Sequence, residues 1–238
     1  TAIYPPLDPA QVVHDARDPR RVLFVSPTPA KGGYVVMRLL HELRAGRPDI
    51  PVEVIEGRAT FADLCAEAAR HGLAIADHPH LLITPSVPRP RDVFARARVL
   101  VMPSVWSESF GKLAAEAVMN GVPALVPSRG GLPEAIGRAI GQPAMPDGKP
   151  VSSVQPAPGF VLPLPAGLTP QATTPISSVD AAPWLDHIVR LMDDQAFYDA
   201  CAASCRGVAD RFTPGVLAEK YVAFFEGVRR CWTPRFGA

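Results

Sequence analysis

The chain has 238 residues, of which 47% are hydrophobic and 20% are charged, a balance typical of globular proteins that bury a core. Its 24 basic and 23 acidic side chains leave a net charge of +1, so the charge balance implies no nucleic-acid partner. The unusual feature is proline, with 28 residues, more than twice the usual share of about 5%. Composition thus excludes a coiled coil, a collagen and a wholly disordered chain, and predicts a folded protein with many proline-marked turns.

Short apolar runs alternate with amphipathic stretches after a polar lead-in at residues 1–20. We expect strands at 21–25, 51–55, 81–84, 99–103 and 124–126, separated by helices that begin near residues 34, 60, 92 and 110, the third of which spans 92–98. Alternation of this kind is typical of α/β proteins. The sequence therefore predicts a single Rossmann-like, doubly wound parallel sheet over residues 21–141.

The second part of the chain has a different pattern. Ten prolines fall between residues 143 and 183, which indicates a long loop over 142–182 with room for a short strand at 159–162. Helical spacing returns from Pro183, and we expect helices at about 183–192, 195–211 and 214–230. Residues 183–238 are accordingly predicted to be C-terminal helices that pack on the core.

Cysteine spacing and the N-terminus bear on the cell compartment. Cys65, Cys201, Cys205 and Cys231 form no Cys-x-x-Cys pair, so we expect reduced, structural thiols. The chain has no run of about 18 apolar residues and no signal-peptide pattern at its start. We therefore expect a cytoplasmic protein, and, because the sequence does not begin with Met, a piece of a longer one. The run His78-Pro79-His80 is interpreted as a turn rather than a metal site.

Three polar loops follow predicted strands, at the sheet edge where doubly wound proteins bind ligands. The first, residues 26–33, contains Lys31, Gly32 and Gly33 but matches neither a Walker loop nor Gly-x-Gly-x-x-Gly. Glycine allows close approach of the backbone to a ligand, and the helix that follows favours an anion at its N-terminus. A turn with a solvated lysine is the simpler interpretation of this segment.

The second loop, residues 103–111, leads into a helix that carries Glu116. Glu108 lies in the loop, so the two carboxylates can reach different hydroxyls of one extended ligand. The backbone amides of Phe110, Gly111, Lys112 and Leu113 open the helix and can hold a phosphate. Taken singly, a glutamate on a helix is more often a solvated surface residue. The third loop, residues 128–134, is rich in glycine, and Glu134 there fits a tight turn before a helix.

Together these loops resemble the donor-binding domain of GT-B glycosyltransferases of the retaining family 4. Glu108 and Glu116, separated by seven residues, match the paired glutamates of that family, and Lys31-Gly32 resembles its Lys-Gly loop. The motifs that carry the resemblance are Pro103-Ser104, Glu108-Ser109-Phe110-Gly111, Glu116-Ala117, Asn120-Gly121-Val122-Pro123 and Gly130-Gly131-Leu132-Pro133-Glu134. The similarity covers residues 21–140, and the C-terminal helices more loosely.

The resemblance implies a role for each matching residue. Glu108 would contact the transferred sugar and Lys31 would neutralise the diphosphate leaving group, which makes them the candidate catalytic residues. Glu116 would bind the ribose, and the base would lie near Thr84 to Val87. Further candidate contacts to the donor are Ser26, Gly32, Ser109, Phe110, Gly111, Lys112 and Leu113. The donor would be a nucleotide-diphosphate sugar, and neither a metal nor another cofactor is expected.

One departure concerns the phosphates. The family often has an arginine five residues before the lysine, where this chain has Ser26. Lys112 and Arg129 are the candidate replacements for that cation, and the donor affinity or donor type is open at this point.

A second departure concerns the rest of the enzyme, because a GT-B protein has two Rossmann-like halves and this chain has one. We expect the N-terminal, acceptor-binding domain to be a partner in the full-length protein, and any membrane association to run through it. Exposed Phe224, Phe225 and Trp232 would mark the contact. The isolated chain is then expected to bind donor but transfer sugar weakly or not at all. A stand-alone sugar-nucleotide binding module without transferase activity is the alternative, and a Rossmann-like domain with coincidental glutamates is a third interpretation.

Overall fold

The computed structural model describes residues 3–137 and 155–231. Its centre is a six-stranded sheet in the order β3-β2-β1-β4-β5-β6, in which every neighbouring pair is parallel. The strands are β1 (Arg21–Val25), β2 (Val52–Ile55), β3 (Leu81–Thr84), β4 (Ala97–Val101), β5 (Ala124–Pro127) and β6 (Gly159–Leu162). This is the strand order of a Rossmann-like, doubly wound fold, and the predicted fold class is confirmed.

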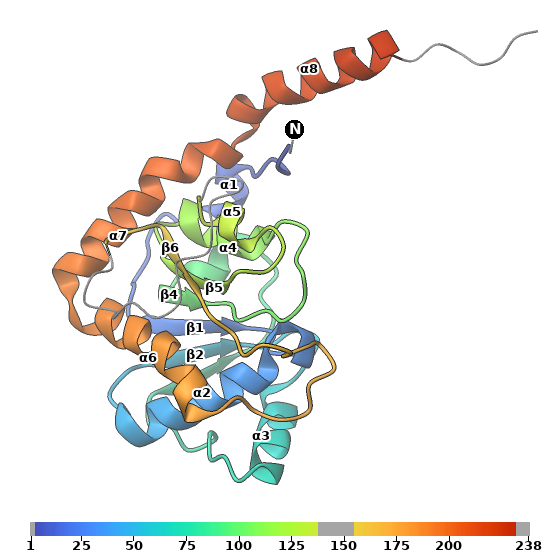
Figure 1. The fold of residues 1–238 in the computed structure, drawn as a ribbon. Helices are drawn as coiled ribbons and strands as arrows, with labels where there is room; N and C mark the ends of the chain where they lie inside the picture. The colour runs from blue at the N-terminus through green and yellow to red at the C-terminus, as the bar shows by residue number, and fades with distance from the viewer. Residues whose placement is uncertain (1–2, 138–154, 232–238) are drawn as a thin grey trace, which may run out of the picture.

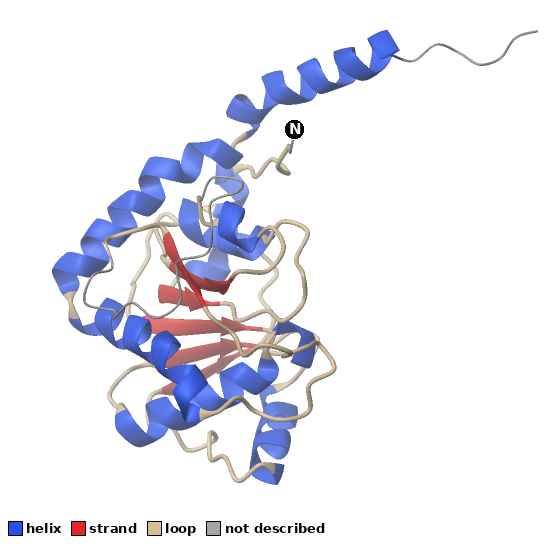
Figure 2. Ribbon diagram, in the orientation of Figure 1, coloured by secondary structure: helices blue, strands red, loops and turns tan. Residues whose placement is uncertain are grey.

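Helices cover both faces of the sheet (Figure 2). Along β1, Val22 and Phe24 pack into the core on one face and Leu23 into the core on the other, and all are fully buried. One core contains residues of α2 (Gly33–Gly46), α3 (Phe61–Arg70) and α6 (Ser178–Asp193), and the other contains residues of α1 (Pro9–Val12), α4 (Lys112–Met119) and α5 (Leu132–Ala135). The strands are mostly apolar because both of their faces are covered, with Glu53 of β2 and Arg98 of β4 as buried charged exceptions.

Two predicted helices differ from the observed ones. The helix expected at 92–98 is a short 3-10 helix, η2 (Pro90–Phe94), and β4 begins at Ala97 because Ala97 pairs with Arg21 of β1. The helix expected from Pro183 begins earlier, at Ser178, with the Ser177 side chain accepting a hydrogen bond from the Asp180 amide. Pro183 therefore lies inside α6. The N-terminal cap fixes the start of the helix, although proline usually occupies its first turn.

The C-terminal helices divide between core and surface. Residues of α6 and α7 (Gln195–Val208) are part of the buried cores, and the chain continues through η4 (Ala209–Phe212). The last helix, α8 (Pro214–Cys231), extends away from the body of the molecule (Figure 1). Its beginning is anchored to other described residues, by buried Leu217 and by a hydrogen bond from the Tyr221 hydroxyl to the Tyr4 carbonyl. The packing expected of residues 183–238 thus does not extend along α8.

Candidate functional site

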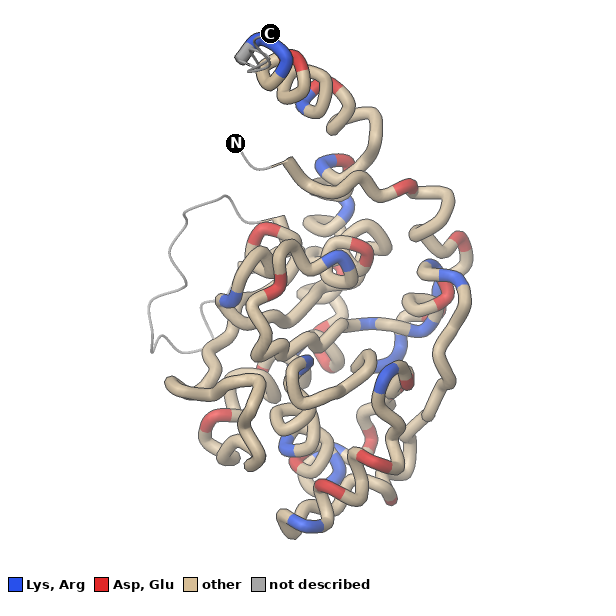
Figure 3. Tube along the Cα trace, turned by 90° about the vertical axis from the view of Figure 1, so that its right-hand side faces the viewer, with Lys and Arg blue, Asp and Glu red and all other residues tan. Residues whose placement is uncertain are grey.

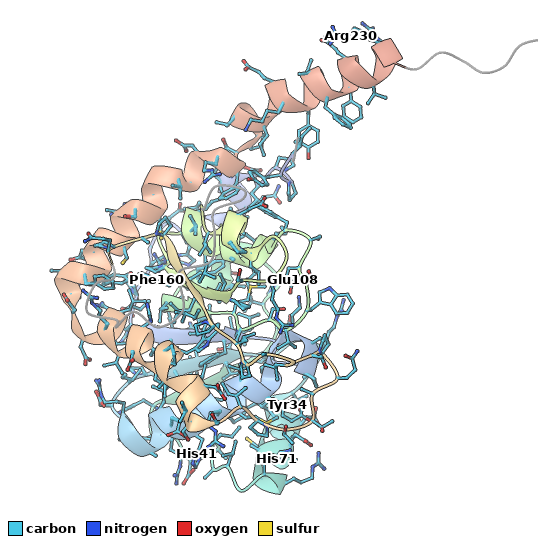
Figure 4. All side chains as sticks on the ribbon, viewed as in Figure 1. Tyr34, His41, His71, Glu108, Phe160 and Arg230 are labelled. Carbon is cyan, nitrogen blue, oxygen red and sulfur yellow. The ribbon has the colours of Figure 1, made fainter. Side chains whose placement is uncertain are left out.

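The candidate site lies at the carboxyl ends of β1 and β4, the adjacent strands from which the chain continues in opposite directions across the sheet. In doubly wound sheets this switch point is the usual ligand position. The 3-10 helix η1 (Pro29–Lys31) follows β1, and the loop containing Glu108 follows β4. Figure 4 shows Glu108 at the edge toward which the strand arrows point.

A cleft of about 750 Å³ opens between these loops, and four of the predicted donor-binding residues line it: Ser26, Lys31, Val87 and Glu108. The Lys31 ammonium forms an ion pair with Oε1 of Glu108. The same carboxylate oxygen accepts a hydrogen bond of 2.9 Å from the hydroxyl of buried Ser104. The two predicted catalytic residues, 77 positions apart in the sequence, are therefore in direct contact.

An adjoining pocket of about 230 Å³ shares Ser26, Lys31 and Glu108 with the cleft and is also lined by Lys112 and Leu113. Lys112 lies on the first turn of α4 and its ammonium is 3.2 Å from Oε1 of Glu116. Glu116 is 5% exposed, and burial raises the pKa of its carboxyl, partly offset by Lys112. The pocket therefore extends the cleft toward the start of α4.

The start of α4 presents the backbone amides that were expected to bind phosphate. Gly111 precedes the helix with a φ of +90°, a conformation that glycine adopts without strain. Phe110 is buried, and its ring stacks on Tyr4 at 5.3 Å between centroids, whereas Ser109 is exposed. Phe110 thus anchors the loop, while Lys112 and Leu113 at the start of the helix line the adjoining pocket.

Glycines allow the three loops to touch. A Cβ atom on Gly32 would lie 2.2 Å from the Pro103 carbonyl oxygen, so the Lys31 loop is in contact with the loop after β4. A Cβ atom on Gly130 would lie 2.0 Å from the Glu108 carbonyl oxygen. That oxygen also accepts a hydrogen bond of 2.8 Å from the Gly131 amide. The third loop therefore supports the backbone of Glu108.

Arg129 and Thr84 have partners outside the cleft. The Arg129 guanidinium donates to the Val105 carbonyl at 2.7 Å and to the Leu168 carbonyl at 2.6 Å. It therefore ties the proline-rich segment to the Glu108 loop. The Thr84 hydroxyl donates to buried Glu53 at 2.7 Å, and Glu53 also pairs with Arg96. Thr84 is accordingly oriented toward a buried ion pair and does not line the cleft.

The sequence prediction missed several residues of the cleft wall. Glu56, Gly57 and Arg58 line it, together with Val93 of η2 and Trp106, whose side chain is exposed. Residues 56–58 directly follow β2, so the rule that ligand loops follow parallel strands could have identified them. No group of three potential metal ligands occurs in the described ranges 3–137 and 155–231.

The fold and the position of the cleft define the chain as one half of a GT-B glycosyltransferase fold. The structure of Anabaena HepE in complex with UDP-glucose superposes with a TM-score of 0.65 at 14% identity, over 95% of this chain and 57% of that one. The pneumococcal O-GlcNAc transferase GtfA in complex with UDP and GlcNAc gives 0.61 at 14% identity, over 95% and 38%. Sucrose-phosphate synthase from Thermosynechococcus elongatus gives 0.57 at 17% identity, over 96% and 50%.

The sequence also shows the family. Residues 5–214 match the family described as "Family 4 Glycosyltransferase in conflict systems", and the chain belongs to it. The predicted resemblance to family 4 is therefore confirmed. The chain spans between 38% and 57% of these three solved structures. No curated protein matches the sequence significantly.

Proposed function

We propose that this chain binds a nucleotide-diphosphate sugar in the cleft at the ends of β1 and β4. The bound sugar is transferred, with retention of configuration, to an acceptor held by a part of the enzyme outside this chain. The observation that carries the proposal is the contact between Lys31 and Glu108 in a cleft of about 750 Å³. That volume is in the range of small-molecule sites, and structures of similar fold are described in complex with UDP and sugars.

In this proposal each group of the cleft contacts a different part of the donor. Without a donor, Lys31 and Glu108 neutralise each other. A bound diphosphate competes for the Lys31 ammonium, which then stabilises the negative charge that develops on the leaving group. Glu108 is freed to accept hydrogen bonds from sugar hydroxyls, with Ser104 still holding one of its oxygens in place.

The remaining donor contacts come from α4. The amides at its N-terminus favour a phosphate, and the buried carboxylate of Glu116 accepts from the ribose hydroxyls. Oε1 of Glu116 is near the Lys112 ammonium but accepts no well-aligned hydrogen bond from the described residues, and ribose hydroxyls would supply such bonds to the ionised carboxylate. This role explains why a costly buried carboxylate lies beside the cleft.

Donor binding is tested by thermal shift with UDP-, GDP- and ADP-glucose. A ligand at a hundred times its dissociation constant stabilises the folded state by about 2.7 kcal/mol. We expect one of the three to raise the melting temperature, and Lys31→Met and Glu108→Gln each to weaken its binding by about tenfold or more. Lys220→Met, an exposed lysine of α8, is the matched control and keeps full affinity.

If none of the three sugar nucleotides stabilises the protein, donor binding is contradicted. Donor binding in this cleft is also contradicted if Lys31→Met and Glu108→Gln both bind the sugar nucleotide as tightly as the wild type does. Transfer is tested separately, by supplying the bound donor with candidate acceptors. A chain that binds donor and transfers nothing, even when joined to its acceptor-binding part, is a binding module rather than half of an enzyme.

A further inference from the structure

We infer that Arg58 is a second cation for the donor diphosphate, supplied by the loop after β2. The inference rests on the proposed donor site and deepens it. Four charged residues line the cleft, the bases Lys31 and Arg58 and the acids Glu56 and Glu108. The charges of these four residues cancel, so a bound diphosphate adds negative charge that needs a further cation. Lys31 already pairs with Glu108. Among the described residues that line the cleft, Arg58 is the basic residue without an anionic partner, and it would bind the phosphates together with Lys31.

The backbone of Arg58 is anchored at the end of β1. Its amide donates a hydrogen bond of 3.2 Å to the hydroxyl of Ser26, which follows β1 directly. A Cβ atom on Gly57 would lie 2.7 Å from that hydroxyl oxygen, so only glycine at 57 allows this close approach. Ser26 itself has a φ of +45°, which is unusual for a residue other than glycine. The arginine is thus attached to the strand end from which the Lys31 loop starts.

The rest of the β2 loop is fixed as well. The Glu56 amide donates to the Thr84 carbonyl at 2.8 Å, and the Glu56 carboxylate accepts from the Phe61 amide at 2.7 Å. Thr60 and Asp63 form a capping box at the start of α3. Glu56 is therefore engaged in holding the loop to α3, and the position of the Arg58 Cα atom is set by its neighbours on both sides.

The side chain of Arg58, in contrast, is free to bind. It is exposed, and no described residue forms a hydrogen bond or ion pair with its guanidinium. The other candidate cations are occupied, because Arg129 donates to two backbone carbonyls and Lys112 pairs with Glu116. A guanidinium has a planar set of donors that fits two phosphate oxygens at once. Arg58 therefore meets the requirements for a diphosphate ligand in the part of the cleft wall that the loop after β2 forms.

The experiment measures binding of inorganic pyrophosphate, UDP, GDP and ADP by isothermal titration calorimetry. Pyrophosphate reports on the phosphate subsite whichever base the protein prefers. We expect Arg58→Gln to weaken binding of pyrophosphate and of the preferred nucleotide by about ten- to a hundredfold, the usual range for a hydrogen bond to a charged group. Arg58→Lys keeps the positive charge but lacks the planar set of donors. We expect its affinity to lie between those of the wild type and of Arg58→Gln.

Two controls separate this effect from a general one. Arg20, an exposed arginine before β1 at the opposite end of the sheet, provides the matched variant Arg20→Gln, which binds as the wild type does. The nucleoside of the preferred nucleotide lacks phosphates, so Arg58→Gln leaves its affinity unchanged. The salt dependence of pyrophosphate binding decreases in Arg58→Gln, because one cation fewer contacts the anion.

The outcomes distinguish the two proposals. If Arg58→Gln binds pyrophosphate and nucleotide with wild-type affinity while Lys31→Met does not, the role of Arg58 is overturned and the donor site stands. If the wild-type protein binds neither pyrophosphate nor any of the three nucleotides, both are overturned. Loss of nucleoside binding in Arg58→Gln overturns the assignment to the phosphates.

Discussion

At the scale of single residues, the candidate site holds a carboxyl group that burial disfavours in its charged form. Glu116 is surrounded by the apolar residues of α4, and its one ionic partner is Lys112 at 3.2 Å. Burial raises the pKa of Glu116 above its ordinary value, and Lys112 offsets only part of that shift. Residues that bind ligands are often retained at the expense of stability in this way.

Replacing Glu116 by Gln should therefore change how stability depends on pH. A raised pKa means that the native state holds the proton more tightly than the unfolded state does. The free energy of unfolding then decreases as the pH rises from the ordinary value of about 4.3 through the raised pKa. Glu116→Gln has no such decrease, so at pH 7.5 it should be more stable than the wild type by about 1 kcal/mol, a typical single-substitution effect.

Urea unfolding of both proteins at pH 4 and pH 7.5 measures this difference. The control is Glu219→Gln, an exposed glutamate of α8, which should follow the wild type at both values. A difference between Glu116→Gln and the wild type that is equal at the two pH values would contradict the raised pKa. Donor affinity should fall in the same variant, because the amide is a weaker acceptor for ribose hydroxyls than a carboxylate.

At the scale of structural elements, the site depends on contacts between loops that only glycine permits. Gly130 has a φ of +54° and lies against the backbone of Glu108. In Gly130→Ala the new methyl group cannot fit 2.0 Å from the Glu108 carbonyl oxygen without moving one of the loops. The left-handed conformation alone costs a residue with a side chain about 1–2 kcal/mol.

We therefore expect Gly130→Ala to lower the free energy of unfolding by about 2 kcal/mol or more and to weaken donor binding as Glu108 shifts. Gly46→Ala is the matched control, since a Cβ atom at this last residue of α2 has no neighbour within 4 Å. That variant should keep its donor affinity and lose no stability. Unfolding by guanidinium and calorimetric titration of the donor measure both quantities.

Most of the fold could be predicted from the sequence because both faces of the strands are covered. β1 and β4 each end in an apolar run, Val22 to Val25 and Val99 to Val101, followed closely by Pro27 and Pro103, and proline marks the strand end. The prediction was wrong where proline did not mark a boundary. Pro183 lies inside α6, since the Ser177 cap, rather than the proline, begins the helix.

The motif residues of the candidate site could be predicted from the sequence, whereas the other residues of the cleft wall could be predicted less well. The motif of Glu108 and the loop of Lys31 identify residues that line one cleft, whereas Glu116 lines neither the cleft nor its adjoining pocket and reaches the latter through Lys112. Arg58 has no motif around it, and its position near Ser26 depends on the pairing of β1 with β2. The orientation of Thr84 depends on Glu53 and Arg96, contacts that strand periodicity does not reveal.

At the scale of the whole molecule, the described chain is a compact α/β body with one projecting helix. Basic and acidic residues are interspersed along the chain (Figure 3). None of the described helices has the length and apolar character needed to span a bilayer. On α8 the side chains of Val222, Phe224, Phe225 and Val228 are exposed, with Phe225 at 62%. Large exposed apolar groups of this kind mark interaction surfaces, and their contact with an acceptor-binding half stays a prediction.

Substitutions at the beginning of α8 should change the free energy of unfolding much more than substitutions near its end. Leu217 is 1% exposed, so Leu217→Ala removes buried contacts and should lower the free energy of unfolding by about 2–4 kcal/mol. The double substitution Phe224→Ser and Phe225→Ser removes only half-exposed rings and should change it by less than about 0.5 kcal/mol. Both variants are compared by guanidinium unfolding, with donor affinity measured in parallel.

A large loss of stability in the Phe224→Ser, Phe225→Ser variant would show that the end of α8 folds back onto the body of the isolated chain. The exposed surface would then be an internal contact rather than one for another part of the enzyme. Unchanged stability and unchanged donor affinity, together with loss of sugar transfer when the acceptor-binding part is joined, would assign these rings to that partner. The two effects can be separated because Leu217 and Tyr221 tie the beginning of α8 to the body, and the exposed rings of Phe224 and Phe225 follow them in the sequence.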